Sequence, residues 1–174
     1  MWYVIQTRTG DEEKLACMIR ELVPRDHYTE CFYIKMESAR KSEDRWEIYL
    51  CPMFPGYLFV DTDTPKDMYF DLKKVPKLTK LLKEDGETFL PVSEEEQKFL
   101  EDIQSEGHIV RRSLVQVDDE KQIISAEGAV GLYLKNVVRQ RVRKRYVLIE
   151  RELLGEKRTI KFGIRLEEDQ LMDV

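Results

Sequence analysis

The sequence predicts an α+β protein with two domains: an N-terminal ferredoxin-like α/β sandwich, in which helices cover one face of an antiparallel sheet, and a small C-terminal β-barrel. Residues 1–104 alternate between strand-like and helix-like apolar runs, in the order β-α-β-β-α-β-α. Residues 113–174 contain only short strand-like runs, and so small a sheet is most stable when it closes on itself. The polar residues 105–112 between them are predicted to be a linker.

The first strand and the first helix are predicted within residues 2–24. Trp2–Thr7 is aromatic and β-branched, which favours a strand that ends before Gly10. A helix should follow, because Thr9 and Glu12 have the spacing of a capping box and apolar residues recur on one helical face as far as Pro24. Those apolar residues are Leu15, Met18, Ile19 and Leu22.

Residues 31–60 are predicted to be mainly extended. Cys31–Ile34 favours a short strand, and the charged residues 37–45 favour an exposed loop or a hairpin tip. Trp46–Val60 is then predicted as one strand interrupted by a bend over residues 52–56, which turns most sharply at Pro55 and Gly56. Proline fixes φ and lacks a backbone donor, whereas glycine adopts positive φ without strain.

Two further helices and a strand complete the predicted N-terminal domain. Pro65 fits the first position of a helix that Pro76 ends, and residues 78–82 can form a strand. Ser93 and Glu96 have the spacing of a capping box at the start of a third helix. The apolar side of this third helix consists of Phe99, Leu100 and Ile103.

The C-terminal domain is predicted to contain about five short strands. Each is an apolar or β-branched run between polar or glycine-containing segments. The runs are Leu114–Val117, Ala129–Tyr133, Tyr146–Ile149, Arg158–Phe162 and Ile164–Leu166.

The composition favours a cytoplasmic protein without a catalytic centre. The 174 residues include no apolar run long enough to span a membrane, and the three cysteines contain no Cys-x-x-Cys pair that would favour zinc. Neither His27 nor His108 has a nucleophile at a recognisable spacing, so each is expected to be exposed or structural. We therefore expect a monomeric protein that is not an enzyme and has no metal and no cofactor.

A basic stretch near the C-terminus is the first candidate for a binding site. Residues 128–149 contain no acidic side chain, although the whole chain carries a net charge of −5. The spacing of two between its arginines would place them about 7 Å apart on one face of an extended hairpin, where they could follow a phosphate backbone. A solubilising edge strand is the alternative. The cations are Lys135, Arg139, Arg141, Arg143, Lys144 and Arg145.

Aromatic residues on the predicted N-terminal sheet are the second candidate. Trp2, Tyr3, Phe54 and Tyr57 fall on neighbouring strands, and the sheet face opposite the helices has no predicted cover. An uncovered apolar face can bind a helix of a partner protein. An ordinary core strand after a tight turn is the alternative for the PGYLFV stretch, residues 55–60.

Four segments of the chain resemble the NusG family of transcription elongation factors. They are WYVIQTRTGDEEK, MFPGYLFV, KKVPKLTKLL with the later LPVSEEE, and LLGEKRTIKF, and they occur in the order of the family. The MFPGY form and the basic hairpin are more similar to a specialised, LoaP-like paralogue than to the general factor. The resemblance covers nearly the whole chain.

The resemblance implies that the N-terminal domain binds the clamp helices of RNA polymerase through an apolar concavity. It also implies that the C-terminal domain is a KOW barrel of the SH3-like kind, which recruits a second partner. Matched by motif, the residues facing the polymerase would be Trp2, Tyr3, Phe54, Pro55, Tyr57 and Leu81.

The C-terminal part departs from the family pattern. Residues 119–130 lack the family's Gly-Pro pair, which puts the usual partners of the KOW domain, the termination factor Rho and a small-subunit ribosomal protein, in doubt. Leu153 and Leu154 match the family's partner-contacting loop, or they belong to the core.

Three functions are compatible with these observations. The first is an antitermination or elongation factor that binds polymerase, reduces pausing or termination, and contacts structured nascent RNA through the basic hairpin. The second is a general elongation factor whose C-terminal domain is a protein adaptor that does not bind RNA. The third is an enzyme acting on nucleic acid, which metal-dependent RNA cleavage would reveal.

Overall fold

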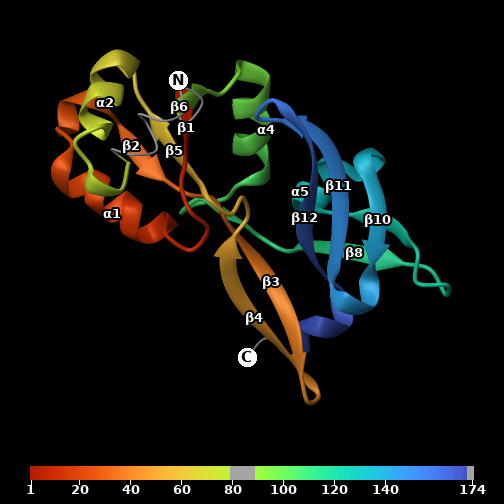
Figure 1. The fold of residues 1–174 in the computed structure, drawn as a ribbon. Coiled ribbons are helices and arrows are strands. Elements are labelled where there is room, and N and C mark those ends of the chain that lie inside the picture. The colour runs from red at the N-terminus through yellow and green to blue at the C-terminus, as the bar shows by residue number, and fades with distance from the viewer. Residues whose placement is uncertain (79–88, 172–174) are drawn as a thin grey trace. The chain divides into compact units, whose positions relative to one another are not determined.

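The computed structural model describes residues 1–78 and 89–171, and the chain forms two compact units (Figure 1). Unit 1 comprises Met1–Ile34 and Phe54–Lys98, and unit 2 comprises Lys35–Met53 and Phe99–Val174. The units are therefore not two consecutive halves of the sequence, because a segment from the first third of the chain belongs to unit 2. The division into an N-terminal domain over residues 1–104, a linker over residues 105–112 and a C-terminal domain over residues 113–174 stays a prediction.

Unit 1 is built on a four-stranded antiparallel sheet with the strand order β2-β5-β1-β6. The inner strand β1 is apolar on both faces, and Val4 and Ile5 are almost completely buried. Val4 lies opposite Phe59 of β5, and Ile5 lies opposite Leu58. The strands are β1 (Trp2–Gln6), β2 (Glu30–Phe32), β5 (Tyr57–Asp61) and β6 (Phe89–Pro91).

Two helices, α1 (Glu12–Leu22) and α2 (Pro65–Leu72), cover one face of this sheet (Figure 1). Pro65 occupies the start of α2, as its fixed φ and missing donor predict. Ile5, Leu58 and Val60 contribute the sheet side of the core between sheet and helices. The helix side consists of Leu15, Ala16, Ile19, Met68 and Leu72. The predicted α+β fold is confirmed.

The third predicted helix is α4 (Glu94–Ile103), which begins in unit 1 and ends in unit 2. Its capping box is complete: the Glu96 amide donates to Ser93 Oγ at 3.2 Å, and the Ser93 amide donates to the Glu96 carboxylate at 3.0 Å. Residues 76–78 are helical, whereas the sequence predicts that a strand starts at 78. The rest of that predicted strand lies outside the described residues.

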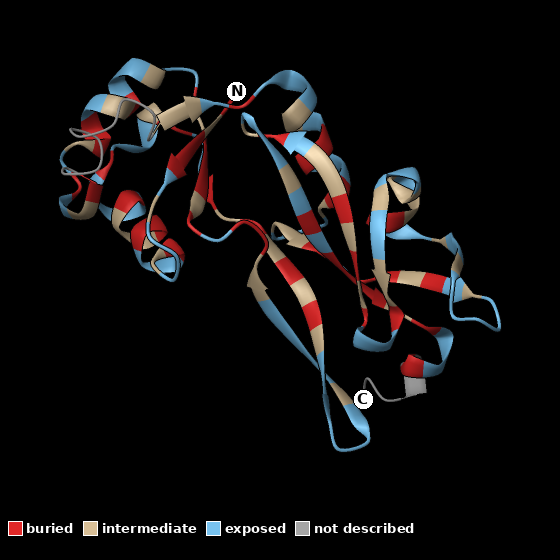
Figure 2. Ribbon diagram, turned by 45° about the vertical axis from the view of Figure 1, so that its right-hand side comes forward, coloured by how far each residue is buried: buried red, intermediate tan, exposed pale blue. Residues whose placement is uncertain are grey.

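Unit 2 contains a long hairpin of β3 (Lys35–Ser42) and β4 (Arg45–Pro52), with β7 (Ile109–Val110) pairing in parallel with β3. Of the two predictions for residues 37–45, the hairpin tip is right at Glu43 and Asp44, whereas an exposed loop over the whole stretch is wrong because the other residues belong to β3 and β4. Near its start β3 alternates buried and half-buried residues, whereas β4 is mostly exposed (Figure 2).

A five-stranded sheet with the order β10-β11-β12-β8-β9 forms the rest of unit 2. The Ile123 amide of the end strand β9 donates to the side-chain oxygen of Gln140 in the other end strand, β10, at 3.0 Å, so the two ends of the sheet lie close together. The strands are β8 (Ser113–Val117), β9 (Ile123–Ala126), β10 (Val137–Arg141), β11 (Tyr146–Leu153) and β12 (Glu156–Arg165).

One predicted strand of this domain is wrong, because residues 128–132 form the short helix α5 (Gly128–Leu132). Tertiary contacts explain the difference. The Val130 amide donates to Ser113 Oγ at 3.1 Å, and a Cβ at Gly131 would lie only 2.4 Å from the Ala126 carbonyl oxygen. Val130 is completely buried. These contacts override the β propensity of the local sequence.

Candidate functional site

An aromatic cluster occupies the face of the unit 1 sheet opposite α1 and α2. Because Leu58 and Val60 face the helices, the intervening Phe59 faces the other side. Its ring centroid lies 6.0 Å from that of Trp2, 5.8 Å from that of Phe32 and 6.3 Å from that of Phe54. The four aromatic side chains are all buried.

The predicted uncovered aromatic face is wrong in this structure. Trp2 and Phe54 are only 7% and 6% exposed. Tyr3 lies on the helix side of the sheet, where its ring stacks on Phe89 at a centroid distance of 4.9 Å. Tyr57 is half-buried and Pro55 is exposed, so these two are the accessible members of the predicted set. Leu81 lies outside the described residues.

The turn that carries Pro55 is fixed by backbone hydrogen bonds. The Thr7 amide donates to the Gly56 carbonyl oxygen at 2.7 Å, and the Tyr57 amide donates to the Phe54 carbonyl oxygen at 3.1 Å. Gly56 has a φ of 83°, and a Cβ at this position would lie 2.8 Å from the Thr7 carbonyl oxygen. The turn therefore requires glycine at this position.

Glu12 also fixes the Pro55–Gly56 turn, through hydrogen bonds of its side chain. Its side chain is only 3% exposed, and its carboxylate accepts hydrogen bonds from the Gly56 amide at 2.7 Å and the Gly10 amide at 2.9 Å. The sequence predicts Glu12 to pair with Thr9 in a capping box, but no side chain caps α1. Glu12 joins Gly10 and Gly56, which are far apart in the sequence and close in space, so the sequence alone could not show this role.

The basic stretch of unit 2 does not form one extended row. Strand β10 ends at Arg141, and residues 142–144 form the 3-10 turn η3 (Val142–Lys144), with Val142 buried. Within residues 1–78 and 89–171 no ion pair involves the four exposed cations or half-buried Arg141. The exposed cations are Lys135, Arg139, Arg143 and Lys144. These five side chains remain candidates for phosphate contact.

Arg145 has a structural position instead. It is 9% exposed, and its guanidinium donates to Asp169 through Nε at 2.7 Å and through Nη2 at 2.9 Å. It also lies over the ring of Trp46, 4.7 Å from the centroid. Burial alone would raise the pKa of Asp169, but the hydrogen bonds from Arg145 and the Leu166 amide hold that pKa below its usual range. We therefore leave Arg145 out of the candidate RNA surface.

The histidines have structural partners. His27 Nδ1 contacts the Asp71 carboxylate, which also accepts from Lys74 Nζ at 3.3 Å. Burial would raise the pKa of Asp71, but these two hydrogen bonds lower it overall. His108 Nδ1 lies 2.8 Å from the side-chain oxygen of Gln104. Both positions agree with the structural role that the sequence predicts for the histidines.

Cysteine and metal chemistry add no further site in the part of the chain that the structure describes. Burial raises the pKa of Cys31 to about 12, so its thiol stays protonated at neutral pH. No three His, Cys, Asp or Glu side chains among the described residues are placed to hold a metal ion. Across the same residues, no helix is both long and apolar enough to cross a membrane.

Comparisons with known proteins give one family match. Residues 1–101 match the family described as transcription termination factor nusG. The structure is similar to one described as domain interaction in Thermotoga maritima NusG, with a TM-score of 0.43, 14% identity and coverage of 94% of this chain and 93% of that one.

A second similar structure is the MjSpt4:Spt5 complex in conformation A, with a TM-score of 0.36, 18% identity and coverage of 94% of each chain. No curated protein matches the sequence. The family match alone covers more than half of the 174 residues. The chain belongs to the NusG family of transcription factors.

Proposed function

We propose that this protein is a cytoplasmic, monomeric antitermination or elongation factor, which binds the clamp helices of RNA polymerase through unit 1 and reduces pausing or termination. In this proposal its basic stretch contacts nascent, structured RNA. The observation that carries the RNA contact is a set of five accessible cations on and beside β10, in a stretch without acidic residues. Membership of the NusG family supports the polymerase contact.

The Pro55–Gly56 turn is the proposed polymerase contact. Pro55 and Tyr57 are its accessible side chains, and the hydrogen bonds of Gly56 with Thr7 and Glu12 fix their positions. A fixed loop loses little conformational entropy on binding. Trp2 and Phe54 support this surface through their contacts with Phe59, whereas Tyr3 stacks on Phe89 on the helix side of the sheet.

Co-purification with RNA polymerase tests this contact. Tyr57→Ala should reduce the amount of polymerase recovered with the tagged protein about tenfold or more, since tyrosine is among the residues that contribute most to binding energy at protein interfaces. Phe70→Ala is the matched control, because Phe70 is 62% exposed on α2, which covers the other face of the sheet. Equal recovery with Tyr57→Ala and with the unmodified protein would refute the proposed contact.

The basic stretch is the proposed RNA contact. Arginine and lysine side chains bind phosphates, and each neutralised phosphate releases counterions, so affinity must fall as salt rises. Arg139, Arg143 and Lys144 are exposed and Arg141 is half-buried on one continuous strand and turn. The exposed apolar residues Leu132 and Val138 lie in the flanking segments.

An RNA titration at several salt concentrations tests this contact. The double variant Arg143→Ala and Lys144→Ala should weaken binding to a structured RNA and reduce the slope of log affinity against log salt by about 1–2. A charge-matched control is Lys14→Ala with Lys66→Ala, which removes two exposed cations of unit 1. An unchanged slope in the first double variant would exclude phosphate contact there.

The basic stretch also favours the specialised, LoaP-like type over a general elongation factor. A general factor whose basic hairpin serves only solubility should give no saturable RNA complex in a gel shift, whereas the proposed function requires one. The usual partners of the C-terminal domain, Rho and a ribosomal protein, gain no support here. Leu153 in the matched loop is completely buried, and only Leu154 is partly accessible.

A further inference from the structure

A groove in unit 2 lies outside both surfaces described above. It has a volume of about 430 Å³, within the range of protein ligand sites, and it is lined by β8, the turn after it, β9 and the segment after β12. None of the basic residues from Lys135 to Lys144 lines it. The residues that line it include Val117, Lys121, Ile124, Leu166, Glu167 and Glu168.

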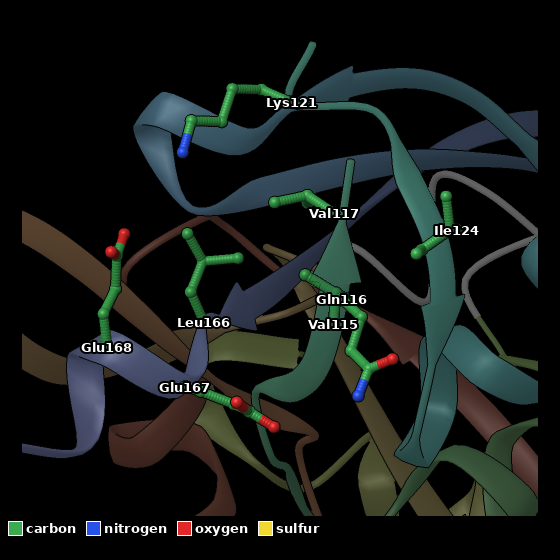
Figure 3. A pocket seen from close by; sticks show the side chains of 8 residues that line it. All are labelled: Val115, Gln116, Val117, Lys121, Ile124, Leu166, Glu167 and Glu168. Atoms are coloured by element: carbon green, nitrogen blue, oxygen red, sulfur yellow. The ribbon is translucent and has the colours of Figure 1, made fainter. Parts of the chain in front are cut away.

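The floor of the groove is aliphatic. Val115 and Leu166 are buried and form its base, and Val117 lies beside them half-buried. In Figure 3 the side chains of Val117 and Leu166 lie next to each other, with Lys121 above and Glu168 to one side. An aliphatic base below polar walls suits a partner side chain that is itself aliphatic.

A β-bulge brings Ile124 to the wall of this groove. In the pairing of β8 with β9, Gln116 lies opposite Ser125 and Val117 lies opposite Ile123, so Ile124 has no cross-strand partner. Its side chain is 62% exposed although isoleucine is among the residues most often buried. Bulges reorient side chains and are enriched beside functional sites.

The rim of the groove is predominantly acidic. Glu167 and Glu168 are exposed on one side, and the turn that carries Lys121 also carries the exposed Asp119 and Glu120. The carboxylates of Glu167, Glu168 and the neighbouring turn therefore outnumber the two nearby cations, Lys121 and Arg145, whose guanidinium lies 3.6 Å from the Glu168 carboxylate. Such a rim repels phosphate groups and attracts cationic side chains. The groove is thus opposite in charge to the basic stretch of the same unit.

We propose that this groove, the acidic groove, binds a basic segment of a partner protein, which inserts an aliphatic side chain over Leu166 and places Lys or Arg side chains against Glu167 and Glu168. The aliphatic base favours an aliphatic side chain of the partner, and the acidic rim favours positively charged residues next to that side chain in the partner's sequence. This inference does not depend on the polymerase or RNA contacts, because it uses none of their residues.

Labelled synthetic peptides and the full chain provide the test, by fluorescence anisotropy. A short peptide containing leucine and lysine should bind about tenfold tighter than one with glutamate in place of lysine, and than one with serine in place of leucine. Ile124→Ser should weaken binding of the first peptide about tenfold. Glu167→Gln should weaken it and flatten its salt dependence, whereas Lys121→Gln should strengthen it.

Two exposed residues of the same unit serve as matched controls. Leu132→Ser removes an aliphatic side chain and Glu127→Gln removes a carboxylate, both outside the groove, and neither should change the affinity. Thermal unfolding of each variant verifies that the fold is retained. Failure of all three peptides to bind, equal binding of the acidic peptide, or equal losses in Glu127→Gln and Glu167→Gln would overturn the proposal.

Discussion

Arg145 and Asp169 form a buried ion pair with two hydrogen bonds, at 2.7 Å and 2.9 Å, that connects the turn after β10 to the segment after β12. Arg145 adopts a left-handed backbone conformation, with a φ of 60°, and also donates to the Val142 carbonyl oxygen at 2.8 Å. A non-glycine residue in this region is uncommon. The hydrogen bonds of the Arg145 side chain with Asp169 and Val142 therefore compensate for the unusual backbone conformation of Arg145.

Replacing Arg145 should therefore destabilise unit 2 rather than only weaken RNA binding. Arg145→Ala leaves the buried carboxylate of Asp169 without its main partner, and breaking such a pair costs about 3–5 kcal/mol. Urea denaturation measures the loss. Arg143→Ala, two positions away and exposed, should change the free energy of unfolding by no more than about 0.5 kcal/mol. Equal stability of the two variants would contradict the structural role.

Acid should destabilise the protein through Asp71 and Asp169. Both pKa values are lowered in the folded chain relative to the ordinary 3.8, so the unfolded chain takes up protons first as pH falls. The stabilisation is complete above about pH 4 and is lost as pH falls through the folded pKa values. Denaturation between pH 6 and pH 2 should show the decline. In Asp169→Asn the decline should be smaller than in the unmodified protein.

The two glycines bound by Glu12 provide a matched test of the Pro55–Gly56 turn. Alanine at Gly10 (φ 96°) meets nothing within 4 Å, so Gly10→Ala should cost only the backbone strain of about 1–2 kcal/mol. Gly56→Ala adds the contact with the Thr7 carbonyl oxygen at 2.8 Å and should cost clearly more. Chemical denaturation of both variants measures the difference. A Gly56→Ala variant as stable as Gly10→Ala would show that the turn can move.

Phe54 and Tyr57 should separate stability from binding. Phe54 is buried against Phe59, so Phe54→Ala should destabilise the fold by about 3–5 kcal/mol. Tyr57 is half-buried, and Tyr57→Ala should cost less than half as much. Thermal unfolding compares the two. If Tyr57→Ala were as destabilising as Phe54→Ala, a loss of polymerase binding in the Tyr57 variant would no longer indicate a direct contact.

Local signals in the sequence were sufficient for much of the fold. The capping box of Ser93 and Glu96 and the helix start at Pro65 depend on residues within one helical turn, and both are confirmed. The alternation of Leu58 and Val60 toward the helices follows from strand geometry alone. Helix starts, caps and strand alternation depend on residues close together in the sequence, so they can be predicted from it.

The remaining features depend on contacts between distant residues. The arginine row ends at Arg141 because Val142 is buried and the chain turns. Residues 128–132 form a helix because Ser113 and Ala126 approach Val130 and Gly131 closely. Neither the spacing of residues in the sequence nor their secondary-structure propensities indicate these contacts. The candidate sites were thus located by composition, whereas the accessibility of each side chain required the structure.

The β3–β4 hairpin affects how this chain could be divided or recombined. It is encoded before residue 54, yet it belongs to unit 2, where β3 pairs with β7 and the Glu37 carboxylate lies 2.9 Å from Arg111. A chimera joined once within residues 105–112 would combine a hairpin from one parent with packing strands from the other. Exchange of a functional C-terminal unit between relatives therefore requires two coordinated segments, which makes single-crossover recombination an unfavourable evolutionary route for this chain.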